Sequence, residues 1–150
     1  MVLIRTLRDL SIDTSITEAY YTEGPLHFDE WYALVQEKYP NATKIACQDN
    51  HLTKLNCPNA IKIWCSDNQL TELNYSNAIR IFCYDNPNLE IIKAPKLKEL
   101  HYDSDTDVVI PIELDNPKIY DKNYNILNYN EIVERIIQLK RRYTKSAKKI

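Results

Sequence analysis

Cysteine side chains are the best candidates for chemistry in this sequence, because a thiolate can attack a substrate, bind a metal ion or form a disulfide. Three of the four cysteines are evenly spaced, since the step from Cys47 to Cys65 equals the step from Cys65 to Cys83. A metal site would need clustered ligands, such as two cysteines separated by two residues with a histidine nearby. The regular spacing instead puts the three thiols at one position of a repeated unit. There a free cysteine packs as a small apolar side chain.

Other catalytic patterns find no support in the sequence. The three histidines, His27, His51 and His101, are scattered, and a single glycine cannot form a glycine-rich phosphate loop. Cys57 lies between two repeats and is also expected to be structural. We therefore predict a protein that is not an enzyme and that holds no cofactor and no metal ion.

The element that must position these residues is a repeat of fixed period between Pro40 and Ser104, which begins at Asn41, Asn59 and Asn77. Each copy has an alanine, an Ile-x-Cys pair, an asparagine and, in most copies, a leucine at fixed offsets. These positions are Ala42, Ile45, Cys47, Asn50 and Leu52; Ala60, Ile63, Cys65, Asn68 and Leu70; and Ala78, Ile81, Cys83, Asn86 and, one place late, Leu89. A fixed period of this kind indicates a solenoid, in which each coil buries its apolar face on the next.

The pattern resembles the leucine-rich repeat, L-x-x-L-x-L-x-x-N-x-L, over residues 41–105, where Leu97, Leu100 and Tyr102 begin a fourth copy. The resemblance implies an α/β-type solenoid with a parallel sheet on its concave side. Because 18 residues is shorter than the roughly 20–29 of the usual repeat, we expect a convex side without helices. Short repeats rich in Ile, Asn, Lys and Tyr are similar to those of leucine-rich repeat proteins from amoeba-infecting giant viruses.

Two helices are expected to cap the repeats within one domain, 1–150. The stripe over 28–39, with Trp31 and Leu34, predicts a helix that completes an N-terminal cap, 1–40; alternatively, Trp31 and Tyr32 dock a partner as an adaptor box would. Asp13 to Gly24 is expected to be irregular. Residues 108–114 predict one more strand at the edge of the sheet, and 116–125 are rich in turn residues. Asn128-x-x-Glu131 predicts the start of a helix at about 129–143, which completes the C-terminal part, 106–150.

Strand residues between the buried positions are expected to point outward onto the concave sheet. There Ala46, Trp64, Phe82 and His101 would form one column, and Lys44, Lys62 and Arg80 a second, basic one. Exposed aromatic side chains flanked by charge are typical of protein-binding hot spots. The residues that we predict to bind a partner are Lys44, Lys62, Trp64, Arg80, Phe82, Tyr84 and His101. The alternatives are that the rings stack on one another, or that a loop or a second copy of the chain covers them.

Two further columns follow the strands. The asparagines Asn50, Asn68 and Asn86 are expected to satisfy backbone groups at each turn, which is a structural role. The carboxylates of Asp49, Asp67 and Asp85 could cap their own turns, or could recruit a cation or a basic segment.

Composition sets limits on partners and location. The formal net charge of −2 implies no general attraction to nucleic acid or membrane, and no apolar run is long enough to span a bilayer. The first residues lack a signal peptide's apolar core, which predicts a protein of the cytoplasm, including host cytoplasm or a virion. The basic tail Lys140–Lys149 is either a solvated helix end or a nucleic-acid or nuclear-import element, and we favour the first.

From the sequence we predict a non-enzymatic module that binds a host or viral protein through its concave face. The first alternative is a substrate-recognition subunit for ubiquitin ligation, for which residues 1–39 are short. The second is a nucleic-acid-associated protein that uses the basic tail. The third is an enzyme with a reactive cysteine of low pKa.

Overall fold

The structure is a computed structural model, and it describes residues 12–24 and 26–148. Part of the expected N-terminal cap, residues 1–11, therefore lies outside the described residues. The elements in chain order are β1 (Glu18–Tyr20), α2 (Phe28–Lys38), β2 (Lys44–Ala46), β3 (Lys62–Trp64), β4 (Glu72–Asn74), β5 (Arg80–Phe82), β6 (Ile91–Lys93), β7 (Glu99–His101), β8 (Lys118–Tyr120), β9 (Ile126–Leu127) and α3 (Tyr129–Lys148).

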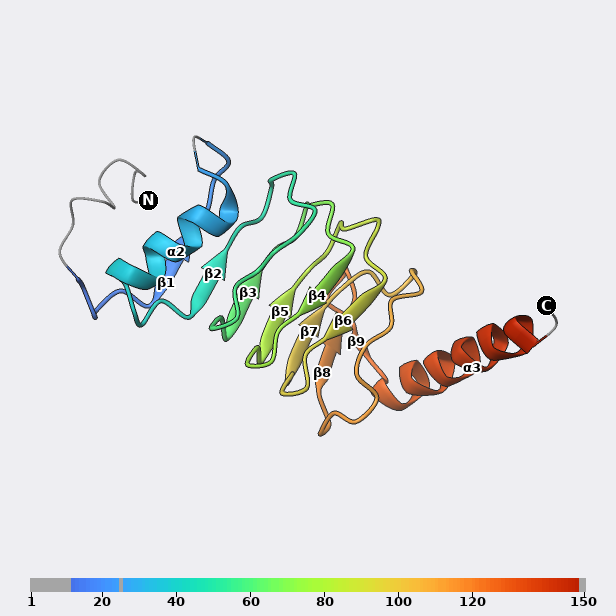
Figure 1. Cartoon of the computed structure of the whole chain (residues 1–150). Coiled ribbons are helices and arrows are strands. Elements are labelled where there is room, and N and C mark those ends of the chain that lie inside the picture. Colours follow the sequence, from blue (N-terminus) through green and yellow to red (C-terminus); the bar gives the residue numbers. More distant parts are fainter. Residues whose placement is uncertain (1–11, 25, 149–150) are drawn as a thin grey trace.

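The strands stack side by side in a solenoid-like arrangement with a helix at each end (Figure 1). The larger sheet has seven strands in the order β1-β2-β3-β5-β7-β8-β9, and all of its neighbours are parallel except the antiparallel pair β8 and β9. Strands β4 and β6 form a second, parallel sheet. The expected stacked α/β architecture with a predominantly parallel sheet is confirmed. Among the described residues between β2 and β8 the chain forms no helix, as the short repeat predicts.

A central row of the core comes from the middle residues of β1, β2, β3, β5, β7 and β8. Pairing aligns these residues in one buried row: Ala19, Ile45, Ile63, Ile81, Leu100 and Ile119. Each strand is very short and would not be stable alone. Burial of an aliphatic side chain stabilises by about 1.5–3 kcal/mol, so the row holds the short strands together.

The asparagine column ties each coil to the one before it. The side-chain amide of Asn68 donates to Cys65 O at 3.1 Å in its own coil and to Cys47 O at 3.0 Å in the preceding coil. Its Oδ1 accepts from Leu52 N at 3.0 Å, also in the preceding coil. Asn86 repeats these contacts one coil later. The structural role expected for the asparagines is therefore confirmed.

The backbone conformation explains why an aspartate precedes each asparagine of the column. Asp49, Asp67 and Asp85 have φ values of 58°, 56° and 54°, in the left-handed region. Glycine is the usual residue there, and Asp and Asn are the side chains that tolerate it best. In a chain with a single glycine, aspartate supplies this turn.

The N-terminal segment corrects one expectation. Asp13 to Gly24 is not irregular throughout, because β1 pairs with β2 and adds a coil ahead of the repeats. Helix α2 forms the return segment of that coil, which makes the step from β1 to β2 longer than the step between later coils. Trp31 and Tyr32 are buried, and the Tyr32 hydroxyl accepts from Asn59 N at 3.2 Å. These two side chains belong to the cap and present no docking surface.

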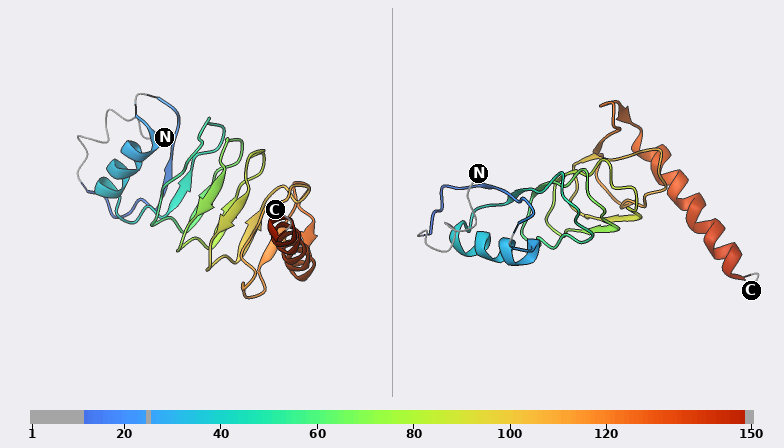
Figure 2. Two further views of the ribbon diagram at one scale, coloured as in Figure 1. Left: turned by 45° about the vertical axis from the view of Figure 1, so that its right-hand side comes forward. Right: turned by 90° about the horizontal axis from the view of Figure 1, so that it is seen from above.

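Two further expectations, both for the C-terminal segment, were wrong. Residues 108–114 form no strand of the large sheet; Val109 makes a single bridge to Ile91, the first residue of β6. The next strand of the large sheet is β8, inside the stretch expected to be turns. Asn128 caps α3 as predicted, with its Oδ1 accepting from Asn130 N at 3.0 Å. Helix α3 is longer than expected, and beyond its first turns it projects from the end of the stack (Figure 2).

Candidate functional site

The outer face of the seven-stranded sheet corresponds to the concave face expected from the sequence, and we call it the sheet face. Strand register places its residues in two columns. The first residues of the strands are Glu18, Lys44, Lys62, Arg80, Glu99 and Lys118. The third residues are Tyr20, Ala46, Trp64, Phe82, His101 and Tyr120.

Four rings of the second column stack on one another. The ring centroids lie 5.7 Å apart for Trp64 and Phe82, 4.1 Å for Phe82 and His101, and 4.5 Å for His101 and Tyr120. The interplanar angles are 12°, 15° and 11°. The alternative that these rings stack on one another is therefore part of the structure. Trp64 and Phe82 remain half-buried, whereas His101 is only 4% exposed.

His101 is held by polar contacts as well as by stacking. Its Nε2 lies 2.8 Å from Glu99 Oε1, and its Nδ1 lies 3.0 Å from the Tyr84 hydroxyl. The Tyr84 hydroxyl donates to Asp121 O at 2.6 Å, so its oxygen is left to accept from Nδ1. Glu99 also accepts from Arg80 Nε at 3.0 Å. The network fixes the imidazole in the stack and leaves it no free polar atom.

The ionisable groups of this network respond to their surroundings. Burial, and after it the nearby Tyr124 and Asp121, raises the pKa of Tyr84 to about 12. Burial alone would raise the pKa of Glu99, but the hydrogen bond from His101 and the charge of Arg80 hold it below its usual range. Glu99 is thus an anion at physiological pH and forms an ion pair with Arg80.

The seven residues predicted to bind a partner therefore differ in availability. His101 and the Tyr84 hydroxyl are engaged within the protein, and Arg80 is paired with Glu99. Trp64 and Phe82 are half-buried, so part of each side chain remains accessible. Within the described part of the chain, the ammonium groups of Lys44 and Lys62 have no ion-pair or hydrogen-bond partner. The available part of the site is the aromatic pair and these two lysines.

Sequence reasoning missed Tyr20, Tyr120 and Lys118, which belong to the same columns. Tyr120 is the fourth ring of the stack, and Tyr20 is exposed beside Ala46 at the other end. Tyr120 follows His101 by the same step by which His101 follows Phe82, so counting one more repeat would have found it. No similar count finds Tyr20, because a helix lies between β1 and β2.

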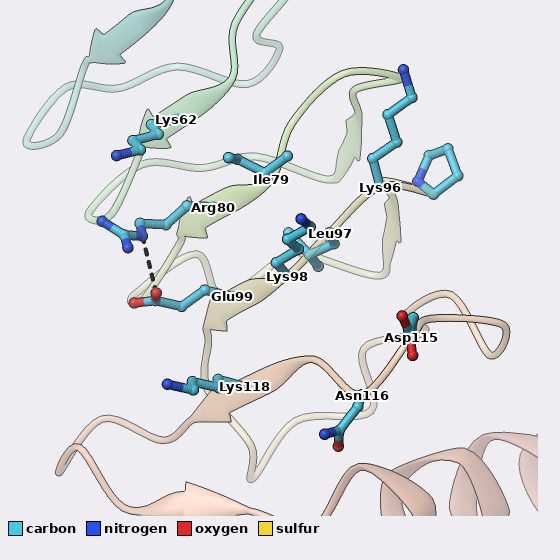
Figure 3. A pocket seen from close by; sticks show the side chains of 11 residues that line it. Lys62, Ile79, Arg80, Lys96, Leu97, Lys98, Glu99, Asp115, Asn116 and Lys118 are labelled. Atoms are coloured by element: carbon cyan, nitrogen blue, oxygen red, sulfur yellow. Dashed lines mark ion pairs between the residues drawn. The ribbon is translucent and has the colours of Figure 1, made fainter.

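A basic groove of about 750 Å³ lies where the strands β3, β5, β7 and β8 begin (Figure 3). Its charged lining residues are Lys62, Arg80, Lys96, Lys98, Glu99, Asp115 and Lys118. Arg80 is paired with Glu99, and Lys96 donates to Asn77 Oδ1 at 3.1 Å. In the part of the chain that the structure describes, Lys62, Lys98 and Lys118 have no polar side-chain partner.

The opposite edge of the sheet face, just beyond the strand ends, is acidic. Burial, and then the charges of Asp85 and Asp49, raises the pKa of Asp67. Lys122 Nζ lies 2.6 Å from Asp85 Oδ1, so one carboxylate of the aspartate column is already paired with a cation of the same chain. Across the described ranges, no three His, Cys, Asp or Glu side chains are placed to hold a metal ion.

All four cysteines are free and buried. Burial raises the pKa of Cys57 to about 12 and raises those of Cys47, Cys65 and Cys83 as well. A thiol needs a lowered pKa and access to solvent to react, so the geometry favours packing.

Comparisons of this chain with protein-family models, curated proteins and solved structures find no match. Neither helix of the described chain combines the length and the apolar character that crossing a bilayer requires.

Proposed function

We propose that this protein is a short leucine-rich repeat module that binds a partner protein through its sheet face and catalyses no reaction. The observation that carries the proposal is the column of stacked rings, which ends in Trp64 and in which Trp64 and Phe82 are only half-buried. Aromatic side chains on the outer face of a sheet do not fill the core, so packing of the core does not explain these rings. Rigid aromatic side chains on a rigid sheet lose little entropy when they bind, which is typical of hot spots.

The assignment to leucine-rich repeats rests on the asparagine column. Asn50, Asn68 and Asn86 each join the turn after a strand to the coil before it. This is the role that the N of the L-x-x-L-x-L-x-x-N-x-L pattern requires. The resemblance to repeat proteins of giant viruses makes an amoebal host extract, or a viral one, the first source in which to look for the partner.

Among the alternatives, substrate recognition for ubiquitin ligation has less support, since Trp31 and Tyr32 are buried in the cap. Nucleic-acid binding through the basic tail would use exposed cations such as Arg141 and Arg142. The sheet face places stacked rings directly beside lysines, so we favour the sheet face.

The test compares two folded double variants. Trp64→Ala/Phe82→Ala removes the two half-buried rings, and Glu72→Ala/Asn74→Ala changes two exposed residues of β4 in the second sheet. Proteins captured from extract are identified by mass spectrometry, purified, and titrated against each variant. We expect the ring variant to bind at least about tenfold more weakly and the control to match the wild type. Equal binding by all three proteins would refute the proposal.

A further inference from the structure

The charge of the basic groove is not balanced by its own residues. Five cationic and two anionic side chains line it, although the whole chain carries a net charge of −2. One of the two carboxylates, Glu99, is occupied by Arg80 and His101. The ammonium groups of Lys62, Lys98 and Lys118 thus face a concave surface in which the described chain places a single further carboxylate, that of Asp115.

The basic groove is continuous with the half-buried rings of Trp64 and Phe82. Lys62 and Trp64 are the first and third residues of β3, so both side chains lie on the sheet face, about 7 Å apart along the strand. Lys44 extends the same row by one strand. An anionic group beside Lys62 would therefore lie about two residues' length from a group that contacts Trp64.

The acidic edge shows which class of polyanion fits. Asp85, Asp103, Asp105 and Asp121 line a hollow just beyond the strand ends, with Lys122 as its one lining cation. A nucleic acid is negative along its whole length, so it would be attracted to one edge of the sheet face and repelled by the other. A polypeptide can carry carboxylates at one end and neutral or basic residues at the other.

We propose that the basic groove takes an acidic linear segment of the partner protein, with carboxylates against Lys62, Lys98 and Lys118 and an adjoining apolar side chain on Trp64 and Phe82. This inference rests on the proposed function and names the chemistry that the partner must present. Ion pairs at such exposed lysines are weak singly and are screened by salt, so several carboxylates contribute together.

The test uses a displayed library of random linear peptides, selected on the immobilised full chain. Peptides that are enriched are synthesised, labelled and titrated against three proteins besides the wild type. Lys62→Glu/Lys98→Glu/Lys118→Glu reverses the charge of three lysines in the groove. Lys54→Glu/Lys93→Glu/Arg141→Glu makes the same charge change at exposed sites elsewhere. Trp64→Ala/Phe82→Ala removes the rings. A single-stranded oligothymidylate is titrated in parallel.

We expect enriched peptides to pair Asp or Glu with an aromatic or aliphatic residue. They should bind the reversed-groove variant at least about tenfold more weakly, bind the control like the wild type, and weaken with salt. Equal binding to the reversed groove, with loss only in the ring variant, would overturn this inference and leave the proposed function standing. Peptides indifferent to both variants, or no enrichment at all, would also overturn it. Tighter binding of the oligothymidylate, lost on reversal, would overturn it in favour of nucleic acid.

Discussion

The His101 ring lies parallel to the Phe82 ring, with their centroids 4.1 Å apart and their planes 15° from each other. On its other side His101 stacks on Tyr120, and both of its nitrogens have polar partners. Trp64, at the other end of the stack, contacts only Phe82 among the rings described. The column therefore has a fixed end that contributes to stability and an open end available for binding.

This difference predicts that His101→Ala lowers the stability of the protein more than Trp64→Ala does. Removing His101 abolishes two stacked ring contacts and a hydrogen bond to a carboxylate, so we expect the free energy of unfolding to fall by about 3 kcal/mol. Removing Trp64 abolishes one ring contact and should cost about 1 kcal/mol. Urea unfolding measures both, and a Trp64→Ala variant as unstable as His101→Ala would contradict the division.

The asparagine column predicts a large cost for Asn68→Ala. The substitution leaves the Leu52 N–H without its acceptor and removes amide donors from Cys47 O and Cys65 O. An unpaired buried group costs about 1–3 kcal/mol, so we expect a loss of about 3 kcal/mol in urea unfolding. Asn74→Ala, at an exposed position of β4, is the matched control and should change stability by less than about 0.5 kcal/mol. Similar losses in the two variants would show that the column is not needed.

The buried thiols predict a loss of stability in alkali. Burial raises the pKa of Cys57 from 9.0 to about 12, and it raises the pKa of the other three thiols. Unfolded thiols ionise above pH 9 while folded ones keep their protons, so their contribution is complete below pH 9 and is lost as the pH rises. At pH 10 the loss is about 1 kcal/mol for each thiol.

Urea midpoints between pH 8 and pH 10 measure this loss. A Cys65→Ala variant is expected to lose less over the same interval, because one raised pKa has been removed. Native protein should react with a thiol reagent far more slowly than protein unfolded in urea. Rapid labelling of the native state would show that a thiol is accessible and would reopen the case for cysteine chemistry.

The N-terminal cap predicts a strong effect of Trp31→Ala. Trp31 is 3% exposed and contacts the rings of Tyr21 and Phe28. Truncation of a buried tryptophan costs about 3–5 kcal/mol. Ala33→Ser, on the exposed side of the same helix, should be nearly neutral. Thermal unfolding followed by circular dichroism compares them, and a cap that tolerated Trp31→Ala would argue for a different role of the helix.

The aspartate column predicts that Asp67→Asn stabilises the protein above pH 4. Burial and the charges of Asp85 and Asp49 raise the pKa of Asp67, so its contribution to stability falls as the pH rises from 3.8 through the folded-state pKa. The amide avoids this loss and also tolerates the left-handed backbone. The gain should be under about 1 kcal/mol, and should vanish at pH 3. Destabilisation at pH 7 would show that the carboxylate has a partner.

The repeat period predicted four strands of the large sheet correctly, because Ile45, Ile63, Ile81 and Leu100 recur at almost equal steps. It could not predict β1, since α2 lengthens the first step and Ala19 takes the place of isoleucine. The register of β1 follows from pairing with the edge of β2, which local sequence does not encode.

Residues 108–114 show why hydrophobic pattern alone misplaced a strand. Val108, Val109 and Ile110 favour extended structure, and Val109 does pair, but with Ile91 of β6 in the second sheet. After each strand of the large sheet the chain must cross to the other side before it returns. Leu73, Ile92 and Ile110 are buried at this return step. Residues 108–110 therefore lie on the return side of their coil and not in the large sheet.

The columns of the sheet face could be predicted because residues two apart in a strand share a side. Their availability could not, because it depends on contacts between distant residues. Tyr84 is engaged by Asp121, and His101 by Tyr120, both of which come from the coil after the repeats.

Each asparagine of the column donates a hydrogen bond to a backbone carbonyl of the coil before it, and this contact does not involve either helix. Growth of the molecule is therefore modular: a duplicated segment 59–76 would carry its own strand, turn and tether, and would lengthen the sheet by about 4.8 Å. Unequal recombination between the gene segments that encode these repeats would add or remove whole coils. The reach of the surface, and with it the length of partner that it can hold, could thus change without any alteration of the two caps.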